Sequence, residues 1–221
     1  MDKLINLIKT LQPKTWLIIG IIGVIVIAGV AYWSYSSVPY NTKDPEVQKQ
    51  LEIINNLRKD IKDGKNFVGS YIEIGHIYEE LGDTQRALAT YQKLARLRPQ
   101  SSPPFIALGQ YYKDHNQPEL AEKYILKALN NDPSNVSIYE DLTMLYTYAL
   151  TGREQKFEAL ILDAVNKTPS IKPNLYQILA FYYKNTGNID KAKSYLEQLI
   201  TLAPERTSDW RQAIAELGSN K

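Results

Sequence analysis

Hydrophobic residues recur at spacings of three and four over most of the chain, and the phrase that they form returns after a fixed step. The segment YIEIGHIYEELGD at 71–83 is followed by FIALGQYYKD at 105–114, so the bulky residues that open the two segments lie 34 positions apart. Apolar residues at helical spacing predict amphipathic helices, and the glycines between them predict turns. A sequence period of this length indicates a stack of helix pairs.

Four copies of this phrase align on their opening aromatic residues, Tyr71, Phe105, Tyr139 and Tyr176, if the internal turn of the third copy holds two extra residues. In three of the four copies, small residues stand where the two helices of a pair would cross. These positions are Gly75, Gly109, Thr143 and Ala180 on the first helices and Ala87, Ala121, Phe157 and Ala192 on the second helices. Threonine and phenylalanine replace the small residues in the third copy, so we expect looser packing there.

Turn and breaker residues also recur at fixed places. The turn inside each copy carries Gly82, Asn116, Gly152 or Gly187, where we expect positive φ. The second helix of each copy is followed by Pro99, Pro133, Pro169 or Pro204, which cannot continue it.

This pattern resembles the tetratricopeptide repeat (TPR), and the resemblance covers about residues 68–206. It implies an all-α fold, a right-handed TPR solenoid of antiparallel helix pairs, for which an unrelated helical bundle is the alternative. We expect the four repeats within 67–206, at about 68–101, 102–135, 136–171 and 173–206.

The segments on either side of the repeats are expected to cover the ends of the stack. Asp44-Pro45-Glu46 is typical of a helix start, so residues 44–66 are interpreted as a half-repeat helix that packs through Ile53, Leu57 and Ile61. Residues 207–221 are interpreted as a C-terminal capping helix, with Trp210, Ala213, Ile214 and Leu217 on its apolar face and Gly218 at its end. A solenoid needs such caps to stay soluble.

An apolar run precedes the repeats. WLIIGIIGVIVIAGVAYW at 16–33 contains no charged residue, and at about 1.5 Å per residue it reaches about 26 Å, near the hydrocarbon thickness of a bilayer. Aromatic residues stand at both of its ends, as at membrane interfaces. We therefore expect a single transmembrane helix at 16–35 and a linker at 36–43, with a cleaved signal peptide as the alternative. Residues 1–15 are interpreted as an amphipathic segment, or as an extension of the anchor.

The charges indicate an orientation and argue against one class of partner. Lys3, Lys9 and Lys14 against Asp2 account for the whole net charge of +2, so the rest of the chain is neutral. The positive-inside rule then places the N-terminus in the cytoplasm and the repeats on the periplasmic or extracellular side of the inner membrane. The opposite topology would suit a cytosol-facing receptor on an organelle. A neutral repeat region argues against nucleic acid as a partner.

Residues for catalysis or metal binding are scarce. The chain has no cysteine and only two histidines, His76 and His115, and it has no glycine-rich phosphate loop or nucleophile elbow. We therefore expect no metal, no cofactor and no enzymatic activity, and a function that rests on a binding surface.

The TPR resemblance implies that the first helices of the repeats line a concave groove for a peptide or partner helix. The groove positions expected from the alignment are Ile72, His76, Glu79, Ile106, Gln110, Lys113, Glu140, Met144, Thr147, Tyr148, Gln177, Phe181 and Lys184. The first groove repeat lacks the lysine and asparagine of TPR domains that hold a C-terminal carboxylate, so such a clamp is not expected. Each of these side chains could instead pack against the next helix.

Two functions fit this interpretation. The first is a membrane-anchored scaffold that binds partner proteins, an assembly factor in the bacterial cell envelope. The second is a chaperone-like accessory subunit of the Sec protein-export machinery, whose periplasmic TPR subunit has a similar order of segments. A promiscuous apolar groove would favour the second function, and one saturable partner would favour the first.

Overall fold

The structure, a computed structural model, describes residues 38–219. Two predictions, the amphipathic segment at 1–15 and the transmembrane helix at 16–35, therefore lie outside the described residues, as does the start of the linker. Within the described part, none of the helices combines the length and the apolar character that crossing a bilayer requires.

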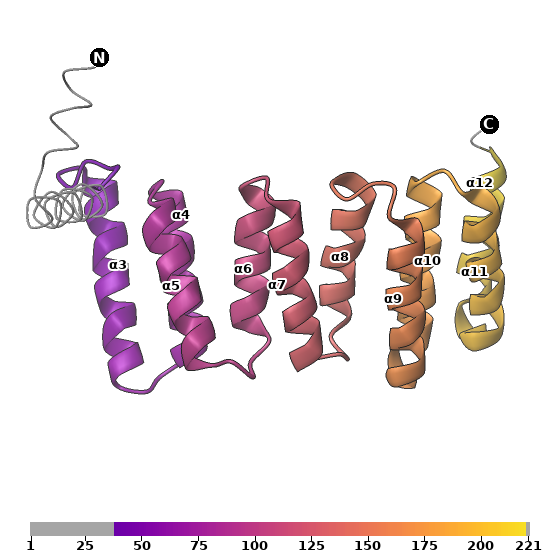
Figure 1. Cartoon of the computed structure of the whole chain (residues 1–221), viewed down its shortest axis with the longest axis horizontal. Coiled ribbons are helices and arrows are strands. Elements are labelled where there is room, and N and C mark those ends of the chain that lie inside the picture. The colour runs from indigo at the N-terminus through magenta and orange to yellow at the C-terminus, as the bar shows by residue number, and fades with distance from the viewer. Residues whose placement is uncertain (1–37, 220–221) are drawn as a thin grey trace, which may run out of the picture.

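Residues 38–219 form a row of helices that stand side by side and alternate in direction, with α3 and α12 at opposite ends of the row (Figure 1). The described part of the chain contains helices, turns and loops but no strand. After α3 (Pro45–Lys62) come the pairs α4 (Phe67–Glu80) and α5 (Thr84–Leu97), α6 (Pro103–Asp114) and α7 (Pro118–Asn131), α8 (Val136–Tyr148) and α9 (Glu154–Lys167), and α10 (Lys172–Asn185) and α11 (Ile189–Leu202). Short 3-10 turns η1 (Pro169–Ile171) and η2 (Pro204–Arg206) precede α10 and the last helix, α12 (Thr207–Ser219).

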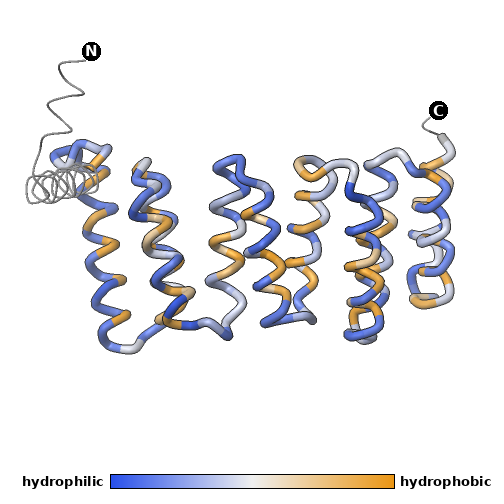
Figure 2. Tube along the Cα trace, in the orientation of Figure 1, coloured by the Kyte–Doolittle hydropathy of each residue, from blue (hydrophilic) through white to orange (hydrophobic). Residues whose placement is uncertain are grey.

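The core forms between neighbouring helices along the whole row. Apolar positions recur along the helices between polar ones (Figure 2), and most of the buried ones make a single cluster from Ile54 in α3 to Leu217 in α12. Each helix thus buries its apolar side against its neighbours, which a single isolated pair could not do.

The turns inside the repeats have the backbone conformation that the sequence predicts. Gly82, Asn116, Gly152 and Gly187 all have positive φ, between 54° and 82°. Three of them are glycines, which adopt this conformation without a steric penalty, and asparagine tolerates it better than most residues. The prediction for all four turns is confirmed.

The crossing positions of the first two pairs are as tight as predicted. A Cβ atom added to Gly75 would lie 2.1 Å from the ring of Tyr91, and one added to Gly109 would lie 2.5 Å from the side chain of Ile125. The facing alanines, Ala87 and Ala121, are fully buried. The small residues therefore allow the two helices of each pair to approach closely.

The third pair is looser, as the two departures from the pattern predict. α8 and α9 lie close together over a shorter length than the helices of the other pairs, and α10 packs against both of them. Phe157, which replaces the usual alanine, is fully buried, and its ring lies 5.1 Å from Tyr146 and 4.5 Å from Tyr182. A phenylalanine needs more room than an alanine, so the pair opens and its space is filled by aromatic rings.

The N-terminal half-repeat begins as predicted but faces the core differently. The Asp44 side chain accepts a hydrogen bond from the backbone N–H of Glu46 at 2.9 Å, which caps α3. The buried residue of α3 is Ile54, whereas Ile53 is 37% exposed, so its predicted packing role is wrong. Four residues of an α-helix turn about 400°, so each step from Ile53 to Leu57 to Ile61 shifts the side chain by about 40° around the helix. Ile53 therefore lies outside the buried stripe.

The last helix covers the C-terminal end of the row. Trp210 and Leu217 are buried, and the guanidinium of Arg206 lies 4.3 Å from the Trp210 ring. The helix includes Gly218 and Ser219, so the prediction that Gly218 stops it is wrong. Glycine lowers helix stability without forbidding the conformation, and α12 simply continues through it.

Candidate partner-binding groove

The first helices of the repeats, α4, α6, α8 and α10, present the predicted groove positions on what is here called the first-helix face. α4 packs against α6, and α8 packs against α10, whereas α8 meets the preceding repeat mainly through α7. This arrangement places residues from different repeats next to one another. The exposure of each predicted side chain then decides whether a partner can reach it.

Most of the predicted positions are open to solvent, and the exposure is greatest in the last two repeats. His76, Lys113, Glu140, Gln177 and Lys184 are exposed or half-exposed, while Ile72, Glu79, Ile106 and Gln110 are half-buried. The large apolar side chains Met144, Phe181 and Tyr148 are 46%, 45% and 64% exposed. Exposed apolar side chains of this size, grouped on one face, are typical of a binding surface.

Thr147 does not belong to the accessible set. It is 8% exposed, and its hydroxyl has no hydrogen-bond partner among the described residues. Met144 and Tyr148 lie one helical turn apart on the same side of α8, whereas Thr147 is offset from both and faces the packed side. Its predicted place in the groove is therefore wrong.

A cavity of about 300 Å³ lies between α8 and α10 and brings together four of the predicted positions of the last two repeats, but not Tyr148 or Lys184. Its walls come from the two first helices only: Val136, Glu140, Thr143, Met144, Asn174, Gln177, Ile178 and Phe181. Met144 and Phe181 contribute the accessible apolar surface, and Glu140 and Gln177 contribute polar groups. A mainly apolar hollow with a few polar groups is the usual form of a site that holds one side chain or a short segment.

Four residues that line this cavity were not predicted as groove positions from the sequence. Val136 lies one turn before Glu140, and Asn174 lies one turn before Gln177, so extending the groove stripe by one turn would have found both. Ile178 and Thr143 are almost fully buried and lie at the floor of the cavity, where the pattern of exposed groove positions gives no signal.

The first repeat offers a more rigid surface. The Tyr91 hydroxyl donates a hydrogen bond to the Glu79 carboxylate at 2.6 Å, and burial followed by this hydrogen bond raises the pKa of Tyr91. The His76 ring meets Tyr91 edge-on at 5.9 Å. Glu79 is thus already engaged, and His76 is held by an aromatic contact; no group of three or more potential metal ligands occurs among the residues described.

Charges on the first-helix face differ between repeats. Glu140 and Asp141 make α8 acidic, whereas Lys172 and Lys184 make α10 basic. Burial raises the pKa of Asp141, and the charge of Lys113 on α6 opposes this shift. Of these charged residues only Glu140 lines the apolar cavity, and the α10 wall carries the neutral polar groups of Asn174 and Gln177. This lining favours a ligand with one apolar side chain between polar neighbours.

Comparison with known proteins bears on the repeats. A sequence profile described as tetratricopeptide repeat matches residues 68–101, 104–135 and 173–206. The matched segments cover the pairs α4–α5, α6–α7 and α10–α11 except for the first residue of each pair.

Among curated proteins, the chain is similar to the type IV pilus assembly protein PilF of Pseudomonas aeruginosa, with 22% identity over 133 residues. The match covers 60% of this chain and 52% of that protein, so the chain spans about half the length of this relative.

Solved structures with a similar arrangement include P. aeruginosa PilF (22% identity, TM-score 0.46, 68% of this chain and 67% of that one). MamA is similar too, with 18% identity and a TM-score of 0.49 over 75% of this chain and 98% of that one. A thermophilic TPR protein of Thermus thermophilus is also similar, with 19% identity and a TM-score of 0.48 over 74% of this chain and 88% of that one.

The repeated helix pairs, their positive-φ turns and the matched segments lead to the same conclusion. Residues 38–219 form an all-helical solenoid, and the chain carries tetratricopeptide repeats.

Proposed function

We propose that this protein is a membrane-anchored TPR scaffold that binds a segment of a partner protein in the groove between α8 and α10. The observation that carries the proposal is the cavity of about 300 Å³ with Met144 and Phe181 exposed at its walls. These two side chains lie on different repeats, so a bound segment would contact both first helices at once.

The ligand that suits this groove has an apolar side chain flanked by polar residues. Burying one such side chain fully contributes about 1.5–3 kcal/mol, and a few anchors of this kind supply most of the affinity of a peptide. Glu140 on one wall and Lys184 further along α10 are exposed and can pair with charges on either side of the anchor.

We further propose that the scaffold acts as an assembly factor in the bacterial cell envelope. The similarity to a type IV pilus assembly protein supports an assembly role, although it spans only 52% of that protein. The apolar run at 16–33 supports an anchor in the inner membrane, and the three lysines that precede it support a cytoplasmic N-terminus with the repeats on the far side.

Crosslinking from within the groove tests this function in the cell. A photo-reactive amino acid at position 144 or 181 of the full-length protein should give one dominant adduct, and the same amino acid at position 193 of α11 should not. A broad smear of adducts from the groove positions would instead favour the Sec-associated chaperone. Adducts from position 193 with none from 144 or 181 would contradict the groove assignment.

A further inference from the structure

The second helices of the repeats form another face of the solenoid, and two clefts lie on it on either side of α5. The first cleft, of about 470 Å³, is walled by α3, α4 and α5. The second, of about 390 Å³, is walled by α5, α6 and α7. Neither cleft shares a residue with the groove between α8 and α10.

The two clefts occupy equivalent positions in the repeating structure. Six lining positions of the first cleft recur 34 residues later in the second, pairing Arg58 with Gln92, Ile61 with Ala95, Tyr71 with Phe105, Ile74 with Leu108, Thr90 with Tyr124, and Lys93 with Lys127. A surface built twice by the repeat can contact a ligand at two successive points.

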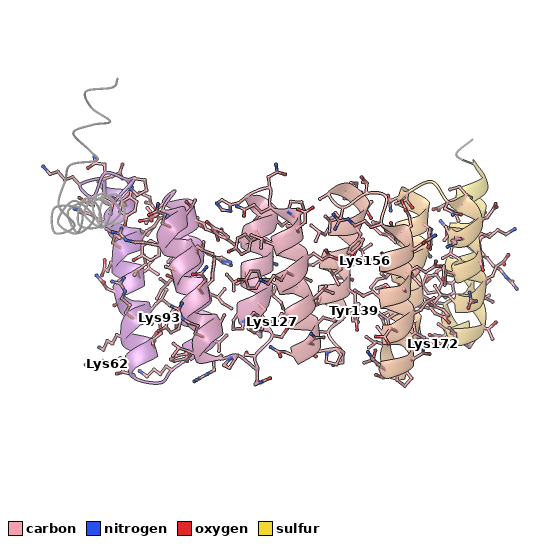
Figure 3. All side chains as sticks on the ribbon, in the orientation of Figure 1. Lys62, Lys93, Lys127, Tyr139, Lys156 and Lys172 are labelled. Atoms are coloured by element: carbon pink, nitrogen blue, oxygen red, sulfur yellow. The ribbon has the colours of Figure 1, made fainter. Side chains whose placement is uncertain are left out.

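Each cleft holds a lysine above an aromatic ring. The Lys93 amine lies 5.6 Å from the centre of the Tyr71 ring, and the Lys127 amine lies 4.4 Å from the centre of the Phe105 ring. Figure 3 shows Lys93 and Lys127, together with Lys62 of α3, along one face of the molecule. The rings orient the ammonium groups by cation–π attraction and leave their hydrogens available to an anion.

Most of the positive charge in the clefts has no acidic partner. No Asp or Glu is among the residues that line either cleft, and α5 itself carries Arg86, Lys93 and Arg96 but no acid. Arg86 is neutralised by Asp83 at 2.8 Å. Within residues 38–219, Arg58, Lys93, Arg96 and Lys127 make no ion pair, and Arg58 donates a hydrogen bond to the Tyr78 hydroxyl at 2.9 Å, which fixes its position.

The arrangement stops after the second repeat. In the third copy, Asp163 stands where Lys93 and Lys127 stand in the first two, and it pairs with Lys167 at 2.6 Å. The equivalent position of the fourth copy is Gln198. The lysine at this repeat position therefore occurs only in the first two copies, as Lys93 and Lys127.

We propose that the face around α5 is a second partner-binding surface, which binds an acidic segment of a protein in an extended form. Carboxylates of the segment would enter the two clefts and meet Arg58 and Lys93 in one and Arg96 and Lys127 in the other. An extended chain places alternate side chains on the same side, so it can reach both clefts across α5. The recessed aromatic floors also favour a chain over a membrane, since a flat lipid surface touches only the rims.

The test uses the full-length protein and a fluorescent peptide of alternating glutamate and serine, with a glutamine–serine peptide as the uncharged control. The acidic peptide should bind, the control peptide should not, and binding should weaken as salt screens the charges. The double variant Lys93→Gln/Lys127→Gln should bind the acidic peptide about tenfold more weakly, because it loses two charges that act at short range. The matched variant Lys167→Gln/Lys193→Gln removes the same net charge elsewhere and should bind within about twofold of the parent.

Three outcomes would overturn the proposal: no binding of the acidic peptide, equal weakening by both double variants, or protection of Lys93 and Lys127 from amine labelling by phosphatidylglycerol vesicles but not by the peptide. Melting curves of both variants must match the parent, and single Lys93→Gln and Lys127→Gln variants replace the double variant if it melts early. The surface is independent of the groove between α8 and α10, so Met144→Ala/Phe181→Ala should leave acidic-peptide binding unchanged.

Discussion

Replacing Gly75 by alanine tests whether close crossing of α4 and α5 limits the sequence. The added Cβ atom would lie 2.1, 2.4 and 2.8 Å from three ring atoms of Tyr91, far inside van der Waals contact. The ring cannot easily move away, because Tyr91 is fully buried and its hydroxyl is hydrogen-bonded to Glu79. The helices must therefore separate, or the ring must leave its position.

The magnitude is the difference of two effects. Overpacking a well-packed core costs about 1–3 kcal/mol, and more where a backbone must shift. Alanine is about 1 kcal/mol more favourable than glycine inside a helix, which offsets part of this cost. We expect Gly75→Ala to lower the free energy of unfolding by up to about 2 kcal/mol, which is up to about 8 °C in Tm for a protein of this size.

A matched control separates the two effects. Gly218 is also helical, and a Cβ atom there would meet nothing within 4 Å, so Gly218→Ala keeps the propensity gain without the clash. It should leave stability unchanged or raise it by up to about 1 kcal/mol. The assay is urea and thermal unfolding of the full-length variants followed by circular dichroism. If Gly75→Ala is as stable as Gly218→Ala, the close crossing is not a constraint and the reasoning fails.

Three further predictions concern the cap, the pH dependence and the topology. Trp210→Ala should lower stability by about 3 kcal/mol in urea unfolding, because the buried aromatic ring of α12 is lost from the end of the stack; an unchanged midpoint would show that α12 is no cap. Burial alone would raise the pKa of Glu122, but hydrogen bonds from Lys156 and Tyr146 lower this pKa overall. The stability that Glu122 contributes is therefore present above the unfolded pKa of about 4.3 and is lost as pH falls through the folded pKa. Acid unfolding should therefore be shallower for Glu122→Gln than for the parent, and parallel curves would refute the role of Glu122. An alkaline phosphatase fused after Lys221 should be active, whereas a stable but inactive fusion would reverse the proposed orientation.

The repeats could be predicted from the sequence because their signals are local. A glycine or asparagine at the turn reflects a backbone requirement, and Gly75 or Gly109 reflects a close approach at one point, so each can be identified from a few residues. The looser third pair follows from Thr143 and Phe157 by the same reasoning. These features depend on residue size and conformation at single positions.

The errors and omissions concern the direction in which side chains point. Ile53 and Ile54 are adjacent and equally apolar, and only the packed neighbours of α3 decide which is buried. Thr147 lies between two exposed groove residues in the alignment but is turned into the helix interface. The clefts beside α5 combine residues of three helices each, and their missing counter-charges become visible only when those helices are placed together.

The central claim is that the groove between α8 and α10 binds the partner, and the affinity of a Met144→Ala/Phe181→Ala variant for the partner identified by crosslinking tests it most directly. Both side chains are about half exposed, so their loss should leave the melting temperature close to that of the parent. The account predicts that the partner binds this variant about thirtyfold more weakly, a loss of about 2 kcal/mol, while Lys123→Glu on the opposite face binds like the parent. A folded double variant with parental affinity would contradict the account.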